Sequence, residues 1–369
     1  MGKSISDAFE EVMAKVGEIG VQAGEAVKSF AESESTERLA RGMKKGTRTA
    51  AEGIAKGAKM AAAGIKEGSQ IASEAIKTNA AKKKAGREQK RNFTLSNGVK
   101  IPAVGYGTYL STENNGKQTI LDAFEAGYRY IDTARFYQNE KEIGEAIKES
   151  GIPRDEIFIC SKVWTTMLGK DRLRESFDAS CEDLQTDNLD MYLIHWPKVS
   201  QNDEEWISKL QDSWEAMEEL YEEGRIKAIG LSNFLPHHIR PLLETARIKP
   251  MLDQLELHAG YMQEYALQYL RKERILAQAW SPLGRARVLG DERVRKLAEE
   301  YDKTSAQVLL RFLIQRGIPV IPKASSFERM KENLDVFDFS LTSDEISYLS
   351  CITETGWSGE HPDLAEWEQ

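Results

Sequence analysis

Four titratable residues between positions 132 and 195 have the types needed to reduce a carbonyl group. They are Asp132, Tyr137, Lys162 and His195. Tyr137 could donate a proton, but a phenol with an ordinary pKa of about 10 is a weak acid at neutral pH. Lys162 beside it should lower that pKa by favouring the phenolate, and Asp132 should keep Lys162 charged. His195 could bond to the substrate oxygen. The four residues therefore predict acid–base chemistry on a carbonyl.

These four residues lie at or just beyond the ends of three short apolar runs. The runs cover residues 130–132, 157–163 and 191–195, and each has the length of a β-strand. Parallel strands bring their carboxyl ends to one face of a fold, and a (β/α)8 barrel carries its chemistry on that face. The spacing therefore predicts parallel strands that gather the four side chains.

Strand and helix patterns alternate along most of the chain, and helical periodicity fills the gaps, as in residues 213–223. Such alternation fits a parallel barrel or a doubly wound sheet. No Gly-x-Gly-x-x-Gly loop follows the first strand, which argues against a doubly wound dinucleotide-binding fold. We therefore predict an α/β fold, the (β/α)8 TIM barrel. The expected strands are residues 103–107, 130–132, 157–163, 191–195, 226–232, 251–257, 275–280 and 319–321.

The chain divides into a leader, residues 1–91, and the barrel, residues 92–369. The barrel begins with a predicted β-hairpin around Asn97-Gly98, which would close its bottom. Residues 38–80 instead repeat every eleven residues, a period that keeps a thin apolar stripe on one side of a helix. Glycines within each repeat weaken that helix by about 1 kcal/mol each. The leader is therefore expected to be disordered alone and helical on a surface.

Charge is unevenly shared between these parts. The chain has a net charge of -9, while residues 1–92 hold 18 Lys or Arg against 12 Asp or Glu, so this part carries +6 and the remainder -15. An acidic enzyme behind a basic leader does not indicate a nucleic-acid-binding protein. The basic amphipathic leader predicts a peripheral contact with an anionic membrane. The alternative is a stress-type disordered segment with no role in lipid binding.

The cysteines and the apolar runs indicate the compartment. Cys160, Cys181 and Cys351 lack metal-ligand spacing, so we expect no metal site, no disulfide framework and a reducing environment. No run of about twenty apolar residues and no signal peptide is present. These features predict a cytoplasmic protein, with peripheral membrane contact through the leader. Gly2 also fits the pattern for N-myristoylation.

Three longer motifs surround the four titratable residues. They are GYRYIDTARFYQNEKEIG (residues 127–144), LQTDNLDMYLIHWP (184–197) and IPKASSFERMKENLDVFDF (321–339). In this order they resemble the signatures of the aldo-keto reductase family, and most closely its bacterial and protozoan members, such as diketogluconic acid reductases and prostaglandin F synthase-like enzymes. The resemblance implies a monomeric TIM barrel that reduces aldehydes and ketones to alcohols with NADPH. It assigns Asp132, Tyr137, Lys162 and His195 to the catalytic tetrad, with Tyr137 as general acid.

The same resemblance implies a set of cofactor-binding residues. Lys323 and Arg329 would meet a 2'-phosphate, so NADPH is expected over NADH. Ala324 stands where a serine is usual, which removes one hydroxyl and softens that preference. Trp280 would stack on the nicotinamide ring. The full implied set is Thr108, Ser232, Asn233, Gln254, Trp280, Ser281, Leu283, Lys323, Ser325, Arg329 and Asn333.

Aromatic residues near the strand ends predict the wall of the substrate pocket. They are Tyr109, Trp164, Trp196 and Trp357, and the alternative for each is ordinary loop packing. Aromatic walls bind apolar carbonyl compounds with little discrimination. The expected partner is thus a small-molecule carbonyl substrate, and steroid, sugar, methylglyoxal and lipid aldehyde all stay open. The alternative function is a regulatory or binding protein that senses the cofactor and turns over slowly.

Overall fold

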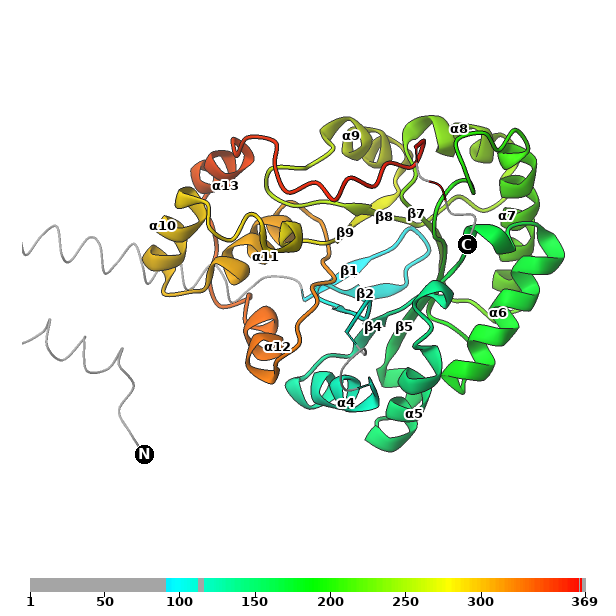
Figure 1. Cartoon of the computed structure of the whole chain (residues 1–369), viewed down its shortest axis with the longest axis horizontal. Helices are drawn as coiled ribbons and strands as arrows, with labels where there is room; N and C mark the ends of the chain where they lie inside the picture. Colours follow the sequence, from blue (N-terminus) through cyan, green and yellow to red (C-terminus); the bar gives the residue numbers. More distant parts are fainter. Residues whose placement is uncertain (1–90, 112–115, 365, 367–369) are drawn as a thin grey trace, which may run out of the picture. The chain divides into compact units, whose positions relative to one another are not determined.

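The computed structural model describes residues 91–111, 116–364 and 366, and within them a parallel sheet of seven strands curves into a barrel (Figure 1). The strands follow one another in chain order, and each pairs in parallel with the next. The strands predicted over residues 103–107 and 226–232 are each three residues shorter than expected. The strands are β3 (Tyr106–Gly107), β4 (Tyr130–Asp132), β5 (Phe158–Val163), β6 (Met191–Ile194), β7 (Ile229–Ser232), β8 (Leu252–Glu256) and β9 (Leu276–Trp280).

The barrel closes at Val320, where an eighth strand was predicted over residues 319–321. That prediction is wrong in extent, because Val320 alone bridges Val104 on one side and Ala279 on the other. Ala279 also donates its backbone N–H to the carbonyl of Pro319 at 2.9 Å. Pro319 and Pro322 have no N–H to donate, so a continuous ladder is interrupted on both sides of Val320. The position still joins the two edges of the sheet, and the prediction of a TIM barrel is confirmed.

Helices surround the strands on the outside (Figure 1). The helix predicted from residues 213–223 is the second half of α7, and its Trp214, Met217 and Leu220 are buried as the periodicity indicates. The α-helices are α4 (Gly116–Ala126), α5 (Glu140–Ser150), α6 (Lys170–Leu184), α7 (Trp206–Glu222), α8 (Pro236–Thr245), α9 (Glu264–Glu273), α10 (Glu292–Tyr301), α11 (Ser305–Gln315), α12 (Phe327–Leu334) and α13 (Ser343–Ser350). Short 3-10 helices are η1 (Arg135–Tyr137), η2 (Arg154–Glu156), η3 (Thr165–Met167) and η4 (Gly284–Ala286).

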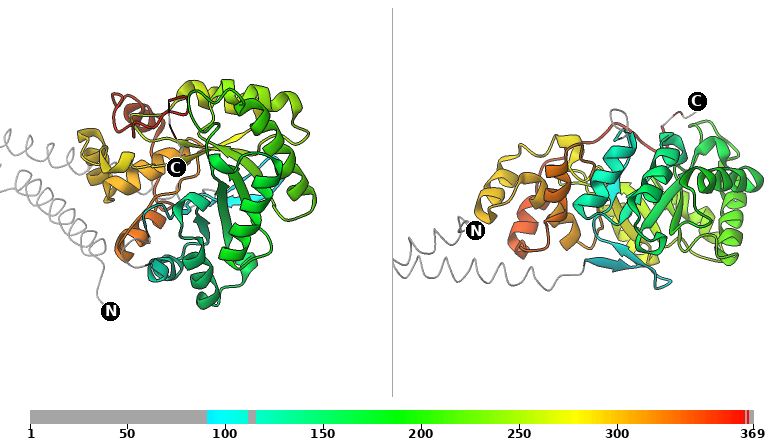
Figure 2. Two further views of the ribbon diagram at one scale, coloured as in Figure 1. Left: turned by 45° about the vertical axis from the view of Figure 1, so that its right-hand side comes forward. Right: turned by 90° about the horizontal axis from the view of Figure 1, so that it is seen from below.

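The predicted hairpin is formed by β1 (Asn92–Thr94) and β2 (Lys100–Pro102), which pair antiparallel. Gly98 in its turn has a φ of 89°, a left-handed conformation that glycine adopts without strain. The side chain of Asn97 donates to the carbonyl of Lys227 at 2.9 Å, just before β7 begins. The hairpin therefore covers the amino ends of the strands, and the C-terminal segment lies at the opposite end (Figure 2).

No helix among the described residues is long and apolar enough to cross a membrane. The eleven-residue repeat, Gly2 and the leader assigned to residues 1–91 lie outside the described residues, apart from residue 91 itself. Those parts of the sequence analysis remain predictions.

Candidate active site

Asp132 and Lys162 form an ion pair inside the carboxyl end of the barrel. Asp132 is the last residue of β4 and Lys162 lies near the end of the neighbouring strand β5. The Lys162 Nζ is 2.6 Å from Asp132 Oδ1 and donates a second hydrogen bond to the carbonyl of Thr133 at 2.9 Å. Lys162 is 0% exposed. A charge buried this deeply requires a partner, and the strand register provides it.

Tyr137 and His195 complete the group. Tyr137 ends η1, the short 3-10 turn that follows β4, and His195 follows the last residue of β6. The Lys162 Nζ lies 5.2 Å from the centre of the Tyr137 ring, and the Tyr137 and His195 rings are 5.6 Å apart. The structure thus brings together all four side chains that the sequence analysis selected, although they lie on three different strand ends.

Burial and charge act in opposite directions on the lysine of this group. Burial alone would lower the pKa of Lys162, but the charge of Asp132 and the phenol of Tyr137 raise it, and the net pKa lies above the ordinary value. Burial and the nearby Lys162 hold the pKa of His195 well below its usual range. At neutral pH the group therefore contains a charged lysine and a neutral histidine.

The expectation that Lys162 gives Tyr137 a lowered pKa is wrong in its net sign. Burial raises the pKa of Tyr137, to about 12, because the phenolate would lose its hydration, and the charge of Lys162 only partly offsets this. Tyr137 as a whole is half-buried, and its hydroxyl stays protonated at neutral pH. The Tyr137 phenol therefore holds a proton at neutral pH, and Lys162 is the group that lowers its pKa most.

Three of the expected nicotinamide residues are linked to the tetrad by hydrogen bonds. The Trp280 indole N–H donates to Asn233 Oδ1 at 2.8 Å, and Asn233 Nδ2 donates to the carbonyl of His195 at 3.0 Å. Asn233 has a φ of 65°, a left-handed conformation that asparagine tolerates. Gln254 Nε2 donates to Asp132 Oδ2 at 2.7 Å. Asn233 thus joins Trp280 to the backbone of His195, while Gln254 contacts the side chain of Asp132.

Ser232 and Thr108 are also used within the barrel. Ser232 Oγ donates to the carbonyl of Gln254 at 3.0 Å. Thr108 Oγ1 donates to the carbonyl of Asp132 at 2.9 Å, and the carbonyl of Thr108 accepts from Asn139. These bonds fix the loop ends around the ion pair. Neither Thr133 nor Asn139 was selected from the sequence, although both follow the strand that ends at Asp132.

Ser281 and Leu283, two of the expected cofactor-binding residues, follow β9 in a tight turn. Ser281 has a φ of 48°, and its carbonyl accepts the backbone N–H of Gly284 at 2.8 Å. Both side chains are half-buried. The turn begins directly after Trp280, the last residue of β9, so Ser281 and Leu283 follow Trp280 closely in the chain.

The expected phosphate residues lie where the chain leaves Val320 and enters α12. Lys323, Ser325 and Arg329 are exposed, and neither Lys323 nor Arg329 forms an ion pair with any described residue. Lys323 Nζ reaches only the carbonyl of Leu110, at 3.5 Å. Asn333 is buried in the last turn of α12. We refer to Lys323 and Arg329, which are both exposed, as the basic rim.

Aromatic side chains form the mouth around Tyr137. The ring of Tyr109 lies 5.0 Å from that of Tyr137, and Trp164 lies 5.1 Å from His195. Phe136 stacks on Trp164 with ring centres 3.9 Å apart and is 38% exposed. Phe136 was not selected from the sequence, although it directly precedes Tyr137.

The other two predicted pocket aromatics lie differently. Trp196 is buried, at 4% exposure. Trp357 stands against Tyr261, with ring centres 6.1 Å apart, and its carbonyl accepts from Arg287 at 2.7 Å. The ring contact of Trp357 is therefore with the loop between β8 and α9 and not with the group around Tyr137.

The C-terminal segment crosses the carboxyl end of the barrel and is attached at several points. Glu256 at the end of β8 accepts from the backbone N–H and hydroxyl of Ser358 at 3.0 and 2.7 Å. Arg285 pairs with Glu360 at 2.8 Å. Asp363 pairs with Lys198 at 3.2 Å.

A small space between this segment and the barrel end is lined by Asn233, Leu235, Leu255, Glu256, Tyr261, Gln263, Trp280, Glu360, His361 and Pro362. The segment thus lies beside the expected nicotinamide residues.

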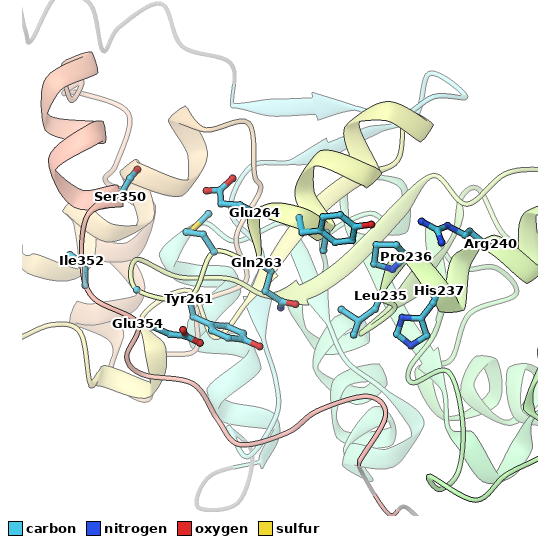
Figure 3. Close-up of a pocket in the computed structure, with 14 residues that line it drawn as sticks. Leu235, Pro236, His237, Arg240, Tyr261, Gln263, Glu264, Ser350, Ile352 and Glu354 are labelled. Carbon is cyan, nitrogen blue, oxygen red and sulfur yellow. The ribbon is translucent and has the colours of Figure 1, made fainter.

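A larger groove of about 620 Å³ lies between the start of α8, the loop before α9 and the chain after α13 (Figure 3). Tyr261 and Gln263 lie between Leu235 on one side and Glu354 on the other. None of the residues selected from the sequence lines this groove. It is separate from the group around Tyr137.

Two polar residues that were not selected lie beneath the tetrad. Gln278 in β9 is 0% exposed, and its Oε1 accepts from Gln254 Nε2 at 2.9 Å and from the Tyr130 hydroxyl at 3.2 Å. Tyr130 is also 0% exposed. A sequence signal for Gln278 exists, since an amide interrupts the apolar run of residues 275–280 two positions before Trp280 and therefore faces the same side of the strand.

Comparison with known proteins identifies the family that this barrel belongs to. The profile of the Aldo/keto reductase family matches residues 103–354. Glyoxal reductase of Bacillus subtilis is 40% identical over 275 residues, which covers 74% of this chain and 97% of that protein. The 9,11-endoperoxide prostaglandin H2 reductase of Trypanosoma cruzi is 39% identical over 276 residues, covering 73% of this chain and 94% of that protein. The chain belongs to the aldo/keto reductase family.

Solved structures agree with this assignment. An aldo/keto reductase from Brucella melitensis is 38% identical with a TM-score of 0.66, and the match covers 70% of this chain and 98% of that one. The aldose reductase of Schistosoma japonicum is 34% identical with a TM-score of 0.68, covering 76% of this chain and all of the other, 100%. Members of the family are oxidoreductases that reduce carbonyl groups with a nicotinamide cofactor. The resemblance to this family is therefore confirmed.

Proposed function

We propose that this protein is an NADPH-dependent reductase of aldehydes and ketones in which Tyr137 is the general acid. The observation that carries the proposal is the fully buried ammonium of Lys162, which lies between Asp132 and the Tyr137 ring. A charged lysine in the interior is costly and serves no packing need. Beside a phenol it stabilises the anion that proton donation leaves behind.

Each member of the tetrad then has one task. Tyr137 donates its proton to the carbonyl oxygen as negative charge develops there. Lys162 stabilises the resulting phenolate, and Asp132 keeps Lys162 charged and in place. His195, which is neutral, orients the carbonyl oxygen by a hydrogen bond from its ring. Bound NADPH would supply the hydride.

The residues present fit a nicotinamide cofactor. Among the described residues no group donates to Gln254 Oε1, so this acceptor is free to receive an amide N–H such as that of a carboxamide. Trp280 is half-buried and held by Asn233, which leaves a flat aromatic face at the barrel end. Ser232, Thr108, Ser281 and Leu283 would hold the rest of the cofactor.

The preference for NADPH rests on the basic rim. Neither Lys323 nor Arg329 forms an ion pair with an acidic group among the described residues. A phosphate monoester is the ligand that such a pair suits best, because charge-assisted hydrogen bonds to it are short and strong. The ribose hydroxyl of NADH offers no charge to this pair. Ser325 and Asn333 would complete the contacts with the adenosine end.

The substrate class follows from the mouth. Tyr109, Phe136 and Trp164 present aromatic surface within a few ångströms of Tyr137 and His195. Such a wall accepts small aldehydes and apolar ketones with modest selectivity. Since two relatives are named for glyoxal and for a prostaglandin endoperoxide, glyoxal and apolar carbonyl compounds are the first substrates to test.

For residues 1–91 we propose attachment to an anionic lipid surface, as the eleven-residue repeat and the +6 charge of residues 1–92 suggest. The isolated leader should gain helical circular dichroism on anionic vesicles and lose it in high salt. A leader that stays unstructured with such vesicles at low salt would favour a protein partner or a disordered segment instead.

Steady-state consumption of NADPH and of NADH, measured in parallel with a panel of small aldehydes and ketones, tests the main proposal. Turnover with several aldehydes and a lower KM for NADPH than for NADH is expected. Tight cofactor binding without turnover on any carbonyl would instead support a cofactor-sensing protein.

A further inference from the structure

A chain of buried hydrogen bonds runs from the tetrad into the barrel interior. Gln254 Nε2 donates to Asp132 Oδ2 at 2.7 Å and to Gln278 Oε1 at 2.9 Å. The Tyr130 hydroxyl donates to the same Gln278 Oε1 at 3.2 Å, and Asp132 Oδ2 is a second, more distant acceptor for it at 3.5 Å. Gln254 and Gln278 are direct partners in the register of β8 and β9. All four side chains are at most 2% exposed.

The direction of this chain is fixed by the carboxylate. Asp132 only accepts while it is paired with Lys162, so the amide of Gln254 must turn its NH2 group toward Asp132. The second hydrogen of that NH2 group then needs an acceptor, and Gln278 can supply one only with its oxygen. Tyr130 donates to this oxygen as well. The orientation of both amides therefore follows from the charge on Asp132.

The Gln278 side chain leaves one polar group without a hydrogen bond in this arrangement. Its Nε2 is buried and has no hydrogen-bond partner among the described residues, and an unpaired buried donor destabilises a protein by about 1–3 kcal/mol. Leucine or methionine would fill the same place in the strand without that cost. A residue that is unfavourable for folding and yet contacts the active-site network is explained by its effect on Gln254.

We propose that Gln278, with Tyr130 behind it, is a positioning residue for the cofactor: it fixes the plane of the Gln254 amide so that Gln254 Oε1 is aimed at the nicotinamide carboxamide. This inference rests on the proposed cofactor role of Gln254. One hydrogen bond, to Asp132, would leave the amide free to rotate about that bond, since the terminal torsion of glutamine has broad minima. The second bond, to Gln278, removes this freedom.

A double-mutant cycle tests the proposal in the full-length protein. Quenching of tryptophan fluorescence gives the Kd for NADPH of Gln254→Met, Gln278→Met and the double variant. One neutral hydrogen bond corresponds to about 2- to 10-fold in affinity, so each single variant should bind NADPH less tightly by that order. The double variant should bind no more weakly than Gln254→Met, because Gln278 acts only through Gln254. The kcat at saturating NADPH should change less than the Kd.

Two further variants separate positioning from general damage to the fold. Gln278→Glu keeps an acceptor oxygen for Gln254 and should bind NADPH more tightly than Gln278→Met. Gln307→Met removes another buried amide. Gln307 lies in α11 and donates to the carbonyl of Asp335 at 2.7 Å, and its replacement should leave the Kd for NADPH unchanged. If Gln278→Met does not fold, Tyr130→Phe, which removes only the hydroxyl, should weaken binding in the wild-type background and have a smaller effect beside Gln254→Met, where only its contact with Asp132 is left to lose.

The outcomes separate the positioning role of Gln278 from the cofactor contact of Gln254. Losses in Kd that add in the double variant, or a Kd for Gln278→Met equal to that of the wild type, overturn the positioning role alone. An unchanged Kd in Gln254→Met removes the proposed cofactor contact, and the positioning role with it.

Discussion

The carboxyl end of the barrel contains two regions that handle charge in opposite ways. At its centre, Lys162 is completely buried and paired with Asp132 at 2.6 Å. At its edge, the basic rim exposes Lys323 and Arg329 without an acidic partner among the described residues. The centre is assembled by the protein alone, and its charges are balanced before any ligand arrives. The rim is balanced only by what binds to it, which makes the centre a candidate for chemistry and the rim a candidate for selection.

The largest expected effect comes from removing the proton donor at the centre. Tyr137→Phe should reduce aldehyde turnover by at least about three orders of magnitude, since general acid catalysis and stabilisation of the developing charge are lost together. The Kd for NADPH, measured by tryptophan quenching, should stay near that of the wild type. Turnover within about tenfold of the wild type would mean that another group donates the proton.

Breaking the charge balance at the centre should also destabilise the fold. Asp132→Asn leaves the ammonium of Lys162 buried without a counter-charge, and such a change costs about 3–5 kcal/mol in the free energy of unfolding. Asp335→Asn is the matched control, because Asp335 also pairs with a lysine at 2.6 Å but is 61% exposed. Exposed pairs contribute at most about 1 kcal/mol. Equal losses in urea denaturation would contradict the distinction between a buried and an exposed pair.

At the rim, a substitution should change selection and leave stability alone. Arg329→Ala should weaken NADPH binding by one to two orders of magnitude, as a charge-assisted hydrogen bond contributes about 1.5–3 kcal/mol, while NADH binding stays nearly constant. Titration of both cofactors decides this. A similar loss for both cofactors would show that the arginine does not distinguish a phosphate from a hydroxyl.

The pH dependence of stability should separate the regions further. Because the pKa of His195 is lowered in the folded protein, the unfolded chain binds one more proton below its ordinary pKa of about 6.5. The associated stability is present above pH 6.5 and is lost as the pH falls, at about 1.4 kcal/mol per pH unit. His195→Gln should show a slope smaller by this amount in urea melts between pH 6.5 and 5. Arg329→Ala should keep the slope of the wild type, and any change in it would contradict the prediction.

The smallest expected effect concerns the leader. A protein that begins at Arg91 should keep full aldehyde turnover and NADPH affinity, because all residues of the tetrad and the rim lie in the barrel. The assay compares kcat and KM of the truncated and full-length proteins under the same conditions. A large loss of kcat on truncation would give residues 1–90 a direct part in the chemistry.

The central group of residues could largely be predicted from the sequence, because each member is marked by the apolar run next to it. Asp132, Lys162 and His195 each follow an apolar run, and parallel strands must bring such positions together. The limit of the eighth strand at Val320 was missed, since the missing N–H groups of Pro319 and Pro322 matter only once the neighbouring strands are known. The net pKa of Tyr137 was missed for a related reason, because burial is a property of the whole fold.

The remaining unpredicted features depend on contacts between distant segments. Glu256 and Ser358 are separated by 102 positions and meet only because the C-terminal segment crosses the barrel. Gln278 and Tyr130, separated by 148 positions, share a hydrogen bond across the barrel interior. Glu256, Ser358 and Tyr130 belong to residue types with many ordinary roles, so no pattern in the chain selects them. A polar residue within an apolar strand was the available signal for Gln278, and its partner could be found only in three dimensions.

The hairpin at the amino ends of the strands also determines how this enzyme can be handled. Its first strand begins at Asn92, and its turn is attached to Lys227 on the face opposite the tetrad. A fusion protein, an affinity tag or a solid support joined ahead of Arg91 would therefore meet the closed end of the barrel. Immobilised through Arg91, the barrels would keep their reactive ends open to the solution, and Arg91 is the point from which to build a sensor or a flow reactor.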